Sequence, residues 1–303
     1  MSFESLSHSS HQNWHEKLYP DETSRLKVVE SWKAQTQGNT INRWLHERLL
    51  SICNPFVQPD NQWLTVGDAY GMDGNYLLQK GCKVTATDIS GTFLPLARAE
   101  KYIHQYSVEN VEKLSFADNS FDFVLCKESY HHFPRPHVGV YEMLRVARKG
   151  IILVEPQDPI ARMPLLLAMR NILDRFDPQL LGKFWKNRYS FEEVGNYVFK
   201  LSEREIEKLA MAINLPSVAF KGLNNNYYAA STANLPAESS NAAFRKIERN
   251  LWFDDMLSWL GLKPYQILGA VIFKELPDAA TIQKMTAMGF AHYVFPKNPY
   301  LKA

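Results

Sequence analysis

Residues 63–88 constrain the fold most, because they place an apolar strand, a small-residue turn, a short helix and a second strand in close succession. These pieces read WLTVGD, AYGMDG, NYLLQKG and KVTATD, and Asp88 ends the last one. An acidic residue about 20 positions beyond such a turn is placed to bind a ribose diol, and the turn suits an anionic group. The segment therefore predicts half of a nucleotide-binding unit and a cofactor that contains adenosine.

The alternation of strand and helix continues on both sides of this unit. Two helical patterns precede it, and further strands are expected at 121–127, 151–155, 217–223 and 265–273, with a weaker candidate near 108–111. Such alternation implies a parallel sheet with helices on both faces. The predicted fold class is α/β, a Rossmann-like, seven-stranded, doubly wound sheet whose last strand is antiparallel.

The rhythm breaks after residue 158, which sets the domain organisation that we expect. The parts are an N-terminal tail and helical cap (1–58), a cofactor-binding core (59–158), a helical insertion acting as a substrate lid (159–200), the rest of the core with an inserted helix at 240–261 (201–276), and a C-terminal helix and tail (277–303). Ser202 and Glu205 form a capping-box pattern that begins a helix. Insertions after the fifth and sixth strands should cover the active-site face, because both leave from carboxyl ends of strands.

Charge and cysteine content exclude several function classes. The net charge is +2 without a long basic run, which argues against nucleic acid as a partner. The three cysteines form no CxxC pair, so a zinc knuckle or disulfide framework is not expected and a reducing cytoplasm fits best.

No membrane span or signal peptide is expected. His8, His11 and His15 lie in a polar segment that we interpret as a mobile terminus, with a metal-binding tract as the alternative.

The stretch LSFADNSFDFVLCKESYHHF resembles the class I S-adenosylmethionine-dependent methyltransferases, within the methyltransferase type 11-like group. The resemblance covers residues 63–158 and extends to the final strands. It implies a transferase of class EC 2.1.1.- that binds S-adenosyl-L-methionine and forms S-adenosyl-L-homocysteine. The family loop reads acidic-x-Gly-x-Gly-x-Gly, and here those positions are Thr65, Gly67, Ala69 and Gly71, so two of them depart.

The resemblance also implies a set of cofactor contacts. They are Gly67, Asp68, Ala69, Gly71, Asp73, Asp88, Ile89, Asn110, Val111, Lys127 and Glu128. Asp88 would accept hydrogen bonds from both ribose hydroxyls, since a carboxylate has two acceptor oxygens. Asn110 replaces the aspartate that usually binds the adenine amino group, and its amide oxygen can still accept from it. Asp68 or Asp73 would contact the amino group of the methionyl part.

Catalysis of methyl transfer requires mainly alignment of donor and acceptor and exclusion of water. A base is needed when the acceptor is a hydroxyl, and His131, His132 and Glu128 are the candidates, followed by Glu155 and Asp158. The alternative for the histidine pair is a structural role in the loop. No metal site is predicted for this catalytic region.

The acceptor is expected to be a small molecule or a glycan-type compound, methylated at oxygen. Aromatic and amide side chains of the insertions would bind it, namely Phe184, Trp185, Tyr189, Tyr197, Asn224, Asn225, Asn226, Tyr227, Tyr228, Trp252 and Trp259. One alternative is a noncatalytic adenosyl-binding protein, motivated by Thr65 and Ala69. Another is a nicotinamide-dependent oxidoreductase or epimerase, whose GxGxxG and Tyr-x-x-x-Lys patterns are not found in the expected places. The oligomeric state stays open, a homodimer among the options.

Overall fold

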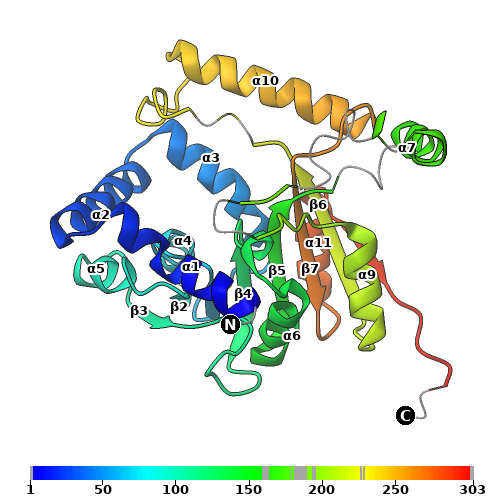
Figure 1. Ribbon diagram of the computed structural model, residues 1–303, viewed down its shortest axis with the longest axis horizontal. Coiled ribbons are helices and arrows are strands. Elements are labelled where there is room, and N and C mark those ends of the chain that lie inside the picture. Colours follow the sequence, from blue (N-terminus) through cyan, green and yellow to red (C-terminus); the bar gives the residue numbers. More distant parts are fainter. Residues whose placement is uncertain are drawn as a thin grey trace.

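One mixed β-sheet forms the centre of the molecule and carries helices on both faces (Figure 1). The computed structural model describes residues 3–158, 164–177, 179–180, 190–192, 196–225, 227 and 229–300. Within these residues the sheet has eight strands in the order β3-β2-β1-β4-β5-β7-β6-β8. The strands are β1 (Gln62–Val66), β2 (Lys83–Asp88), β3 (Gln105–Val108), β4 (Phe121–Lys127), β5 (Ala147–Pro156), β6 (Ser217–Leu223), β7 (Ile267–Phe273) and β8 (Ala291–Val294).

The strand directions confirm the predicted α/β sheet with an antiparallel seventh strand. From β3 to β5 all neighbours are parallel, whereas β7 is antiparallel to both β5 and β6. The segments that follow β1, β2, β3 and β4 therefore lie at one edge of the sheet. The predicted count of seven strands is wrong, because β8 pairs with β6 as an eighth. β8 was missed since it has four residues, none of them fully buried, and so lacks an apolar run.

The helices fill the space between these strands much as the alternation predicts. They are α1 (Phe3–Leu18), α2 (Glu22–Gln37), α3 (Ile41–Leu50), α4 (Met72–Gln79), α5 (Leu94–Ala99), α6 (Pro136–Val146), α7 (Pro164–Phe176), α9 (Glu203–Ala212), α10 (Ala242–Trp259) and α11 (Ala279–Ala287), with short 3-10 turns η1 (Ser51–Cys53) and η2 (Tyr130–His132). No helix among the described residues combines the length and the apolarity needed to cross a bilayer.

Two hydrophobic clusters join the helices to the two faces of the sheet. On one face α6 and α9 pack against the strands through side chains such as Met143 and Leu209. On the other face α3, α4 and α11 do so through side chains such as Leu50 and Leu77. The predicted start of α9 is confirmed, because Ser202 Oγ accepts a hydrogen bond from the amide of Glu205 at 3.3 Å. The fold thus presents its polar strand ends at one edge, between two packed layers of helices.

The N-terminal segment is not the expected mobile tail, because residues 3–18 form α1, drawn in dark blue in Figure 1. The helix has no apolar face to bury, and Ser7 is the buried residue that it contributes. Polar contacts hold it instead: Ser7 Oγ donates to Asn196 Oδ1 at 2.7 Å, and Glu4 lies 3.9 Å from Arg135. Its polar composition explains the wrong expectation, since an amphipathic pattern is the usual signal of a packed helix.

Candidate active site

A cavity of about 560 Å³ lies at the carboxyl ends of the central parallel strands, under α1. Residues that follow β1, β2, β3 and β4 form one wall, and Glu192 adds to it. The other wall is α1, which contributes His8, His11, Trp14 and His15. The volume lies within the range of about 300–1,000 Å³ that is common for small-molecule sites. The cavity is therefore large enough for a cofactor of nucleoside size.

Most of the predicted cofactor residues border this cavity or a second one beside it. The first cavity is lined by Gly67, Ala69, Asp88, Ile89, Asn110, Val111 and Glu128. The second, of about 630 Å³, shares Gly67, Ala69 and Glu128 with the first and adds Asp68, Asp73 and Lys127. Gly71 lines neither of the two. Among the predicted catalytic residues, His132 and Glu128 line the first cavity, and His131 lies next to it in η2.

The glycines of the loop after β1 are needed for the backbone and for packing. Gly67 has φ +68°, and a Cβ there would lie 2.2 Å from Ser129 Oγ. Gly71 has φ +72°, and a Cβ there would lie 2.7 Å from Cγ2 of Ile103. Both angles lie in the left-handed region that favours glycine. These two glycines would be required even without a ligand, so they are weak evidence for one.

Asp68 explains why threonine replaces the usual acid at position 65. The Asp68 carboxylate accepts hydrogen bonds from Thr65 Oγ1 at 2.8 Å, from the amide of Gly74 at 2.8 Å and from the amide of Asp73 at 3.2 Å. It thereby binds free amides at the start of α4. Burial raises the pKa of Asp68, and these hydrogen bonds oppose that rise. The carboxylate is thus inside the loop, where it holds the turn in shape.

Asp88 ends β2 with its side chain at the first cavity. Its Oδ1 accepts a hydrogen bond from the amide of Ser90 at 2.7 Å, while Oδ2 accepts none from the described residues. Burial raises the pKa of Asp88 to about 7, with the Ser90 amide lowering it and the charge of Asp68 raising it. A carboxylate with an unused oxygen that faces a cavity is suited to a diol.

Asn110 lines the same cavity close to Asp88, because the amide of the preceding Glu109 donates to the backbone oxygen of Asp88 at 2.9 Å. Asn110 Oδ1 accepts from the amide of Glu112 at 2.9 Å, and Nδ2 lies 3.4 Å from Nδ1 of His8. Glu112 binds Arg135, with the guanidinium 2.7 Å from its carboxylate. The amide oxygen of Asn110 keeps a second lone pair, and α1 closes this part of the cavity from above.

A buried cation borders the second cavity. Lys127 Nζ is 3.5 Å from Asp73 Oδ1 and 3.2 Å from Glu128 Oε2. Burial raises the pKa of Asp73 to about 8, although the Lys127 ammonium lowers it. Glu128 has φ +51°, a left-handed angle that is uncommon for a residue with a side chain. The backbone at the end of β4 is therefore held in an unusual shape beside the loop after β1.

Unpartnered polar atoms line the second cavity. His46 Nε2 and Asn225 Oδ1 are buried and have no hydrogen-bond partner among the described residues, although His46 Nε2 is 3.5 Å from Asp73 Oδ1. Burial lowers the pKa of His46. Buried polar atoms without partners cost free energy unless a ligand or water binds them. The second cavity therefore has polar groups available to a bound molecule.

Two histidine–carboxylate pairs follow β4. His131 Nδ1 lies 2.6 Å from Oε2 of Glu155, whose other oxygen accepts from the amides of Ser129 at 2.8 Å and Tyr130 at 2.9 Å. Burial lowers the pKa of His131, but the hydrogen bond and charge of Glu155 outweigh it, so the net change is upward. A histidine whose Nδ1 is held by a carboxylate presents Nε2 as a proton acceptor.

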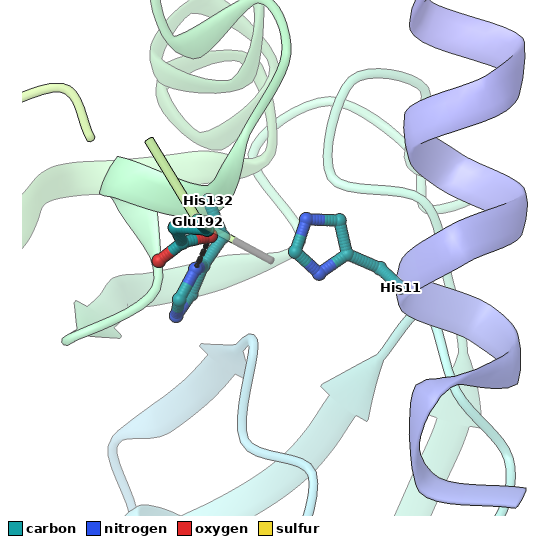
Figure 2. Close-up of side chains that lie close together, drawn as sticks. All are labelled: His11, His132 and Glu192. Carbon is teal, nitrogen blue, oxygen red and sulfur yellow. Dashed lines mark hydrogen bonds and ion pairs between the residues drawn. The ribbon is translucent and has the colours of Figure 1, made fainter. Parts of the chain in front are cut away.

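The second pair is His132 and Glu192, with Nδ1 and Oε2 2.6 Å apart. Burial lowers the pKa of His132, and the nearby His131 lowers it further, while Glu192 opposes both. Figure 2 shows His11 on α1 facing this pair. The three residues border the same cavity as Asp88. Glu192 also lies 3.9 Å from His131 Nε2, which links the two pairs.

The predicted acceptor-binding side chains are only partly placed. Phe184, Trp185, Tyr189, Asn226 and Tyr228 lie outside the described residues. Tyr197, Asn224, Tyr227, Trp252 and Trp259 line neither cavity, and Asn225 lines the second. Trp252 and Trp259 are 66% and 79% exposed on α10, so they face solvent. Asp158, a further base candidate, also lines neither cavity.

Sequence reasoning did not assign α1 or Glu192 to this site. The histidines on α1 were noticed as a group, but their polar surroundings gave no sign of a packed helix. Glu192 is an isolated acid in an irregular segment, and no spacing rule connects it to η2. Only the contacts between distant segments bring these residues to the cavity.

Comparison with known proteins identifies the central part of the chain. Residues 64–154 match the family described as "Methyltransferase domain". Two curated proteins named demethylmenaquinone methyltransferase are similar: that of Chlorobaculum parvum is 28% identical over 130 residues, and that of Chlorobaculum tepidum is 29% identical over 131 residues. Each match covers 41% of this chain and 52% of the relative, so the chain spans about half the length of these curated relatives.

A solved structure extends the likeness of the fold. It is a chain from the Haloferax volcanii complex between the Trm112 methyltransferase activator and a methyltransferase, with 13% identity and a TM-score of 0.50. The match covers 82% of this chain and 95% of that one. The resemblance to class I S-adenosylmethionine-dependent methyltransferases is thus confirmed, and S-adenosylmethionine is the cofactor of that group.

Proposed function

We propose that this protein transfers a methyl group from S-adenosyl-L-methionine to a hydroxyl of a small-molecule or glycan-type acceptor. The observation that carries the proposal is that one cavity brings the carboxylate of Asp88, with its unused oxygen, together with the His132–Glu192 pair, and the His131–Glu155 pair lies next to that cavity. The first feature is suited to a ribose and the second to removal of a proton. The methyltransferase domain match supports the same reaction class.

The cofactor would lie across the rim that the two cavities share, at Gly67, Ala69 and Glu128. Asp88 and Asn110 would bind the adenosyl part in the first cavity. The ammonium of Lys127 lies on the side of the second cavity, where an anionic carboxylate at the methionyl end would be favoured. When bound, the cofactor supplies an activated methyl group on a sulfonium.

The remaining task of the chain is to orient the acceptor and take its proton. His131 is the proposed base, because Glu155 holds its Nδ1 and leaves Nε2 toward Glu192 at the cavity wall. It would reach the acceptor hydroxyl directly or through one water molecule. A base is of use for a hydroxyl acceptor, which is the reason for proposing methylation at oxygen.

The altered loop is compatible with cofactor binding. Thr65 donates to Asp68, whose carboxylate binds the amides of α4, so the turn keeps its shape without the usual acid. This arrangement weakens the argument for a noncatalytic relic, which was motivated by Thr65 and Ala69. The cytoplasmic location and a homodimer stay predictions.

Calorimetry with the full chain tests the proposal. S-adenosylhomocysteine should bind at one site, and NAD⁺ should not bind. Asp88→Ala should weaken the binding of S-adenosylhomocysteine by about 30-fold or more, because about 2 kcal/mol or more of charge-assisted hydrogen bonding is lost. Asp60→Asn is the matched control, because that carboxylate is 79% exposed and pairs only with Lys83 among the described residues. Binding of NAD⁺ without any response to S-adenosylhomocysteine would overturn the assignment.

A turnover assay tests the acceptor class. The chain is incubated with S-adenosylmethionine and separate pools of sugars, phenols and amines, and S-adenosylhomocysteine formation is measured. We expect activity with hydroxyl compounds that falls at least 100-fold in His131→Asn. Activity confined to amines would contradict methylation at oxygen.

A further inference from the structure

Three potential metal ligands meet at the roof of the first cavity. They are His11 of α1, His132 of η2 and Glu192, and the ligand atoms that they offer all lie within 4.8 Å of one another. Figure 2 shows the two imidazoles and the carboxylate converging from three separate segments. The ring centroids of His11 and His132 are 5.5 Å apart. The fold therefore assembles a group that no local spacing in the sequence encodes.

Two imidazoles and one carboxylate form a donor set with a definite preference. Mg²⁺ and Ca²⁺ are bound mainly by oxygen, whereas imidazole nitrogen suits Zn²⁺, Co²⁺, Ni²⁺ and Fe²⁺. Sites with three protein ligands leave a further coordination position for water or substrate. We propose that His11, His132 and Glu192 bind one divalent transition-metal ion, with Zn²⁺ as the test ion, whose open position faces the first cavity.

The spacing of the cluster is compatible with such an ion after small side-chain movements. Ligand distances of about 2.0–2.2 Å in a tetrahedral zinc site place the ligand atoms about 3.3–3.6 Å from one another. The outer limit of 4.8 Å in the cluster is wider than this, and the His132–Glu192 contact of 2.6 Å is shorter. The ion would take the place of the proton between Nδ1 and Oε2 and draw His11 inward.

A buried amide orients the site from behind. Asn196 Nδ2 donates to the backbone oxygen of His132 and lies 2.7 Å from His11 Nε2, while Oδ1 accepts from Ser7 Oγ at 2.7 Å. Asn196 is 1% exposed, so these contacts are shielded from water. It thereby fixes the position of α1 relative to η2.

The location gives the ion a role in the proposed function, on which this part of the inference rests. An ion at the roof would bind the hydroxyl oxygen of the acceptor and lower its pKa. The hydroxyl proton would pass to His131. The oxygen would form its bond to the methyl carbon as the carbon–sulfur bond of the donor breaks, and the electron pair of that bond would remain on sulfur.

Calorimetry with the chelator-treated full chain tests the site directly. ZnCl₂ should bind with a stoichiometry of one per chain, and MgCl₂ should bind at least 100-fold more weakly. His132→Gln and Glu192→Gln should each weaken the binding of Zn²⁺ by at least 30-fold, because each removes one of the three protein ligands. CoCl₂ should give a visible ligand-field spectrum that His11→Gln removes.

Controls separate this site from adventitious binding and from misfolding. His104→Gln changes an exposed histidine that lines neither of the two cavities, and it should keep the wild-type stoichiometry and affinity. Thermal unfolding of each metal-free variant checks that it is folded. The proposal is wrong if Zn²⁺ and Co²⁺ do not bind stoichiometrically, or if binding survives both His132→Gln and Glu192→Gln.

Failure of this inference is distinguishable from failure of the proposed function. S-adenosylhomocysteine is titrated into the metal-free chain in the same series. Binding of S-adenosylhomocysteine without Zn²⁺ binding would remove the metal site and leave the methyltransferase proposal intact. Binding of Zn²⁺ without binding of S-adenosylhomocysteine would keep the metal site and overturn the methyltransferase proposal.

Discussion

Replacing Asp88 with asparagine should abolish most of the pH dependence of S-adenosylhomocysteine binding below pH 8. Burial raises the pKa of this carboxyl to about 7, and only the Ser90 amide offsets the rise. The charged form, with an oxygen unused by the described residues, is the one that can accept from both ribose hydroxyls. Binding therefore requires loss of a proton in the range where Asp88 titrates.

The magnitude follows from the fraction of carboxylate in the free protein. With a pKa of about 7 that fraction is about 0.9 at pH 8 and about 0.09 at pH 6, so the apparent Kd should rise about tenfold over this interval. It should rise about 90-fold between pH 8 and pH 5. Asp88→Asn keeps one oxygen acceptor and cannot titrate. At pH 8 the Kd of the variant should be about 10- to 150-fold higher than that of wild type, because the variant loses one hydrogen bond to a charged group, worth about 1.5–3 kcal/mol.

The same pKa makes a prediction about stability. The folded chain binds the Asp88 proton more tightly than the unfolded chain does, because the pKa of Asp88 is raised from the ordinary aspartate value of 3.8 to about 7. This group therefore lowers the free energy of unfolding as pH rises from about 4 to about 7. Asparagine removes that loss of stability. Without ligand, Asp88→Asn should therefore be more stable than wild type at pH 8, and it should not be more stable than wild type at pH 4. Urea unfolding at the two pH values measures the difference.

The binding assay is isothermal titration of S-adenosylhomocysteine at pH 6, 7 and 8 and constant ionic strength. Other groups near the cavities also titrate, such as Asp73 with a pKa of about 8, so the relevant quantity is the difference between wild type and variant. Asp60→Asn should follow wild type. If wild type and Asp88→Asn show the same slope, Asp88 does not bind the ribose in its charged form and the reasoning fails.

Two further substitutions test how the scaffold of the site is built. Ser202→Ala should cost about 0.5–2 kcal/mol of unfolding free energy through loss of the N-cap of α9, and Ser202→Thr should retain most of it; equal stability of all three in urea would argue against the cap. Gly67→Ala should cost about 2–5 kcal/mol, because the new Cβ would lie 2.2 Å from Ser129 Oγ and φ is +68°. Adding Ser129→Gly to Gly67→Ala should recover only the part of the lost stability that comes from the steric clash. Full recovery of stability in thermal unfolding would mean that alanine at the left-handed angle carries no strain.

Local patterns account for the parts of the fold that sequence reasoning predicted correctly. The apolar run at 217–223 matches β6, and the Ser202 pattern matches the start of α9. In each case residues close in sequence are sufficient, because strand burial and helix capping depend on neighbours within a few positions. Asp88 was placed at the cavity for a related reason, since the end of a parallel strand is a fixed position in this kind of sheet.

The parts that were missed depend on contacts between distant segments. α1 buries only Ser7, so no apolar periodicity marks it in the sequence. Hydrogen bonding to Asn196, which lies far along the chain, helps to hold the helix in place. β8 is short and partly exposed, and its pairing with β6 decides its state. Glu192 is placed beside His132 although 60 positions separate them.

By itself the amino-acid sequence determined the order of strands and helices, the glycine turn and the acidic end of β2, and hence the kind of cofactor, because these features depend on periodicity and on short-range backbone geometry. The tertiary structure decided what surrounds that cofactor site: α1 as its roof, and the meeting of His11, His132 and Glu192. Polar contacts between distant residues leave no periodic trace in a chain, so only the folded arrangement reveals them.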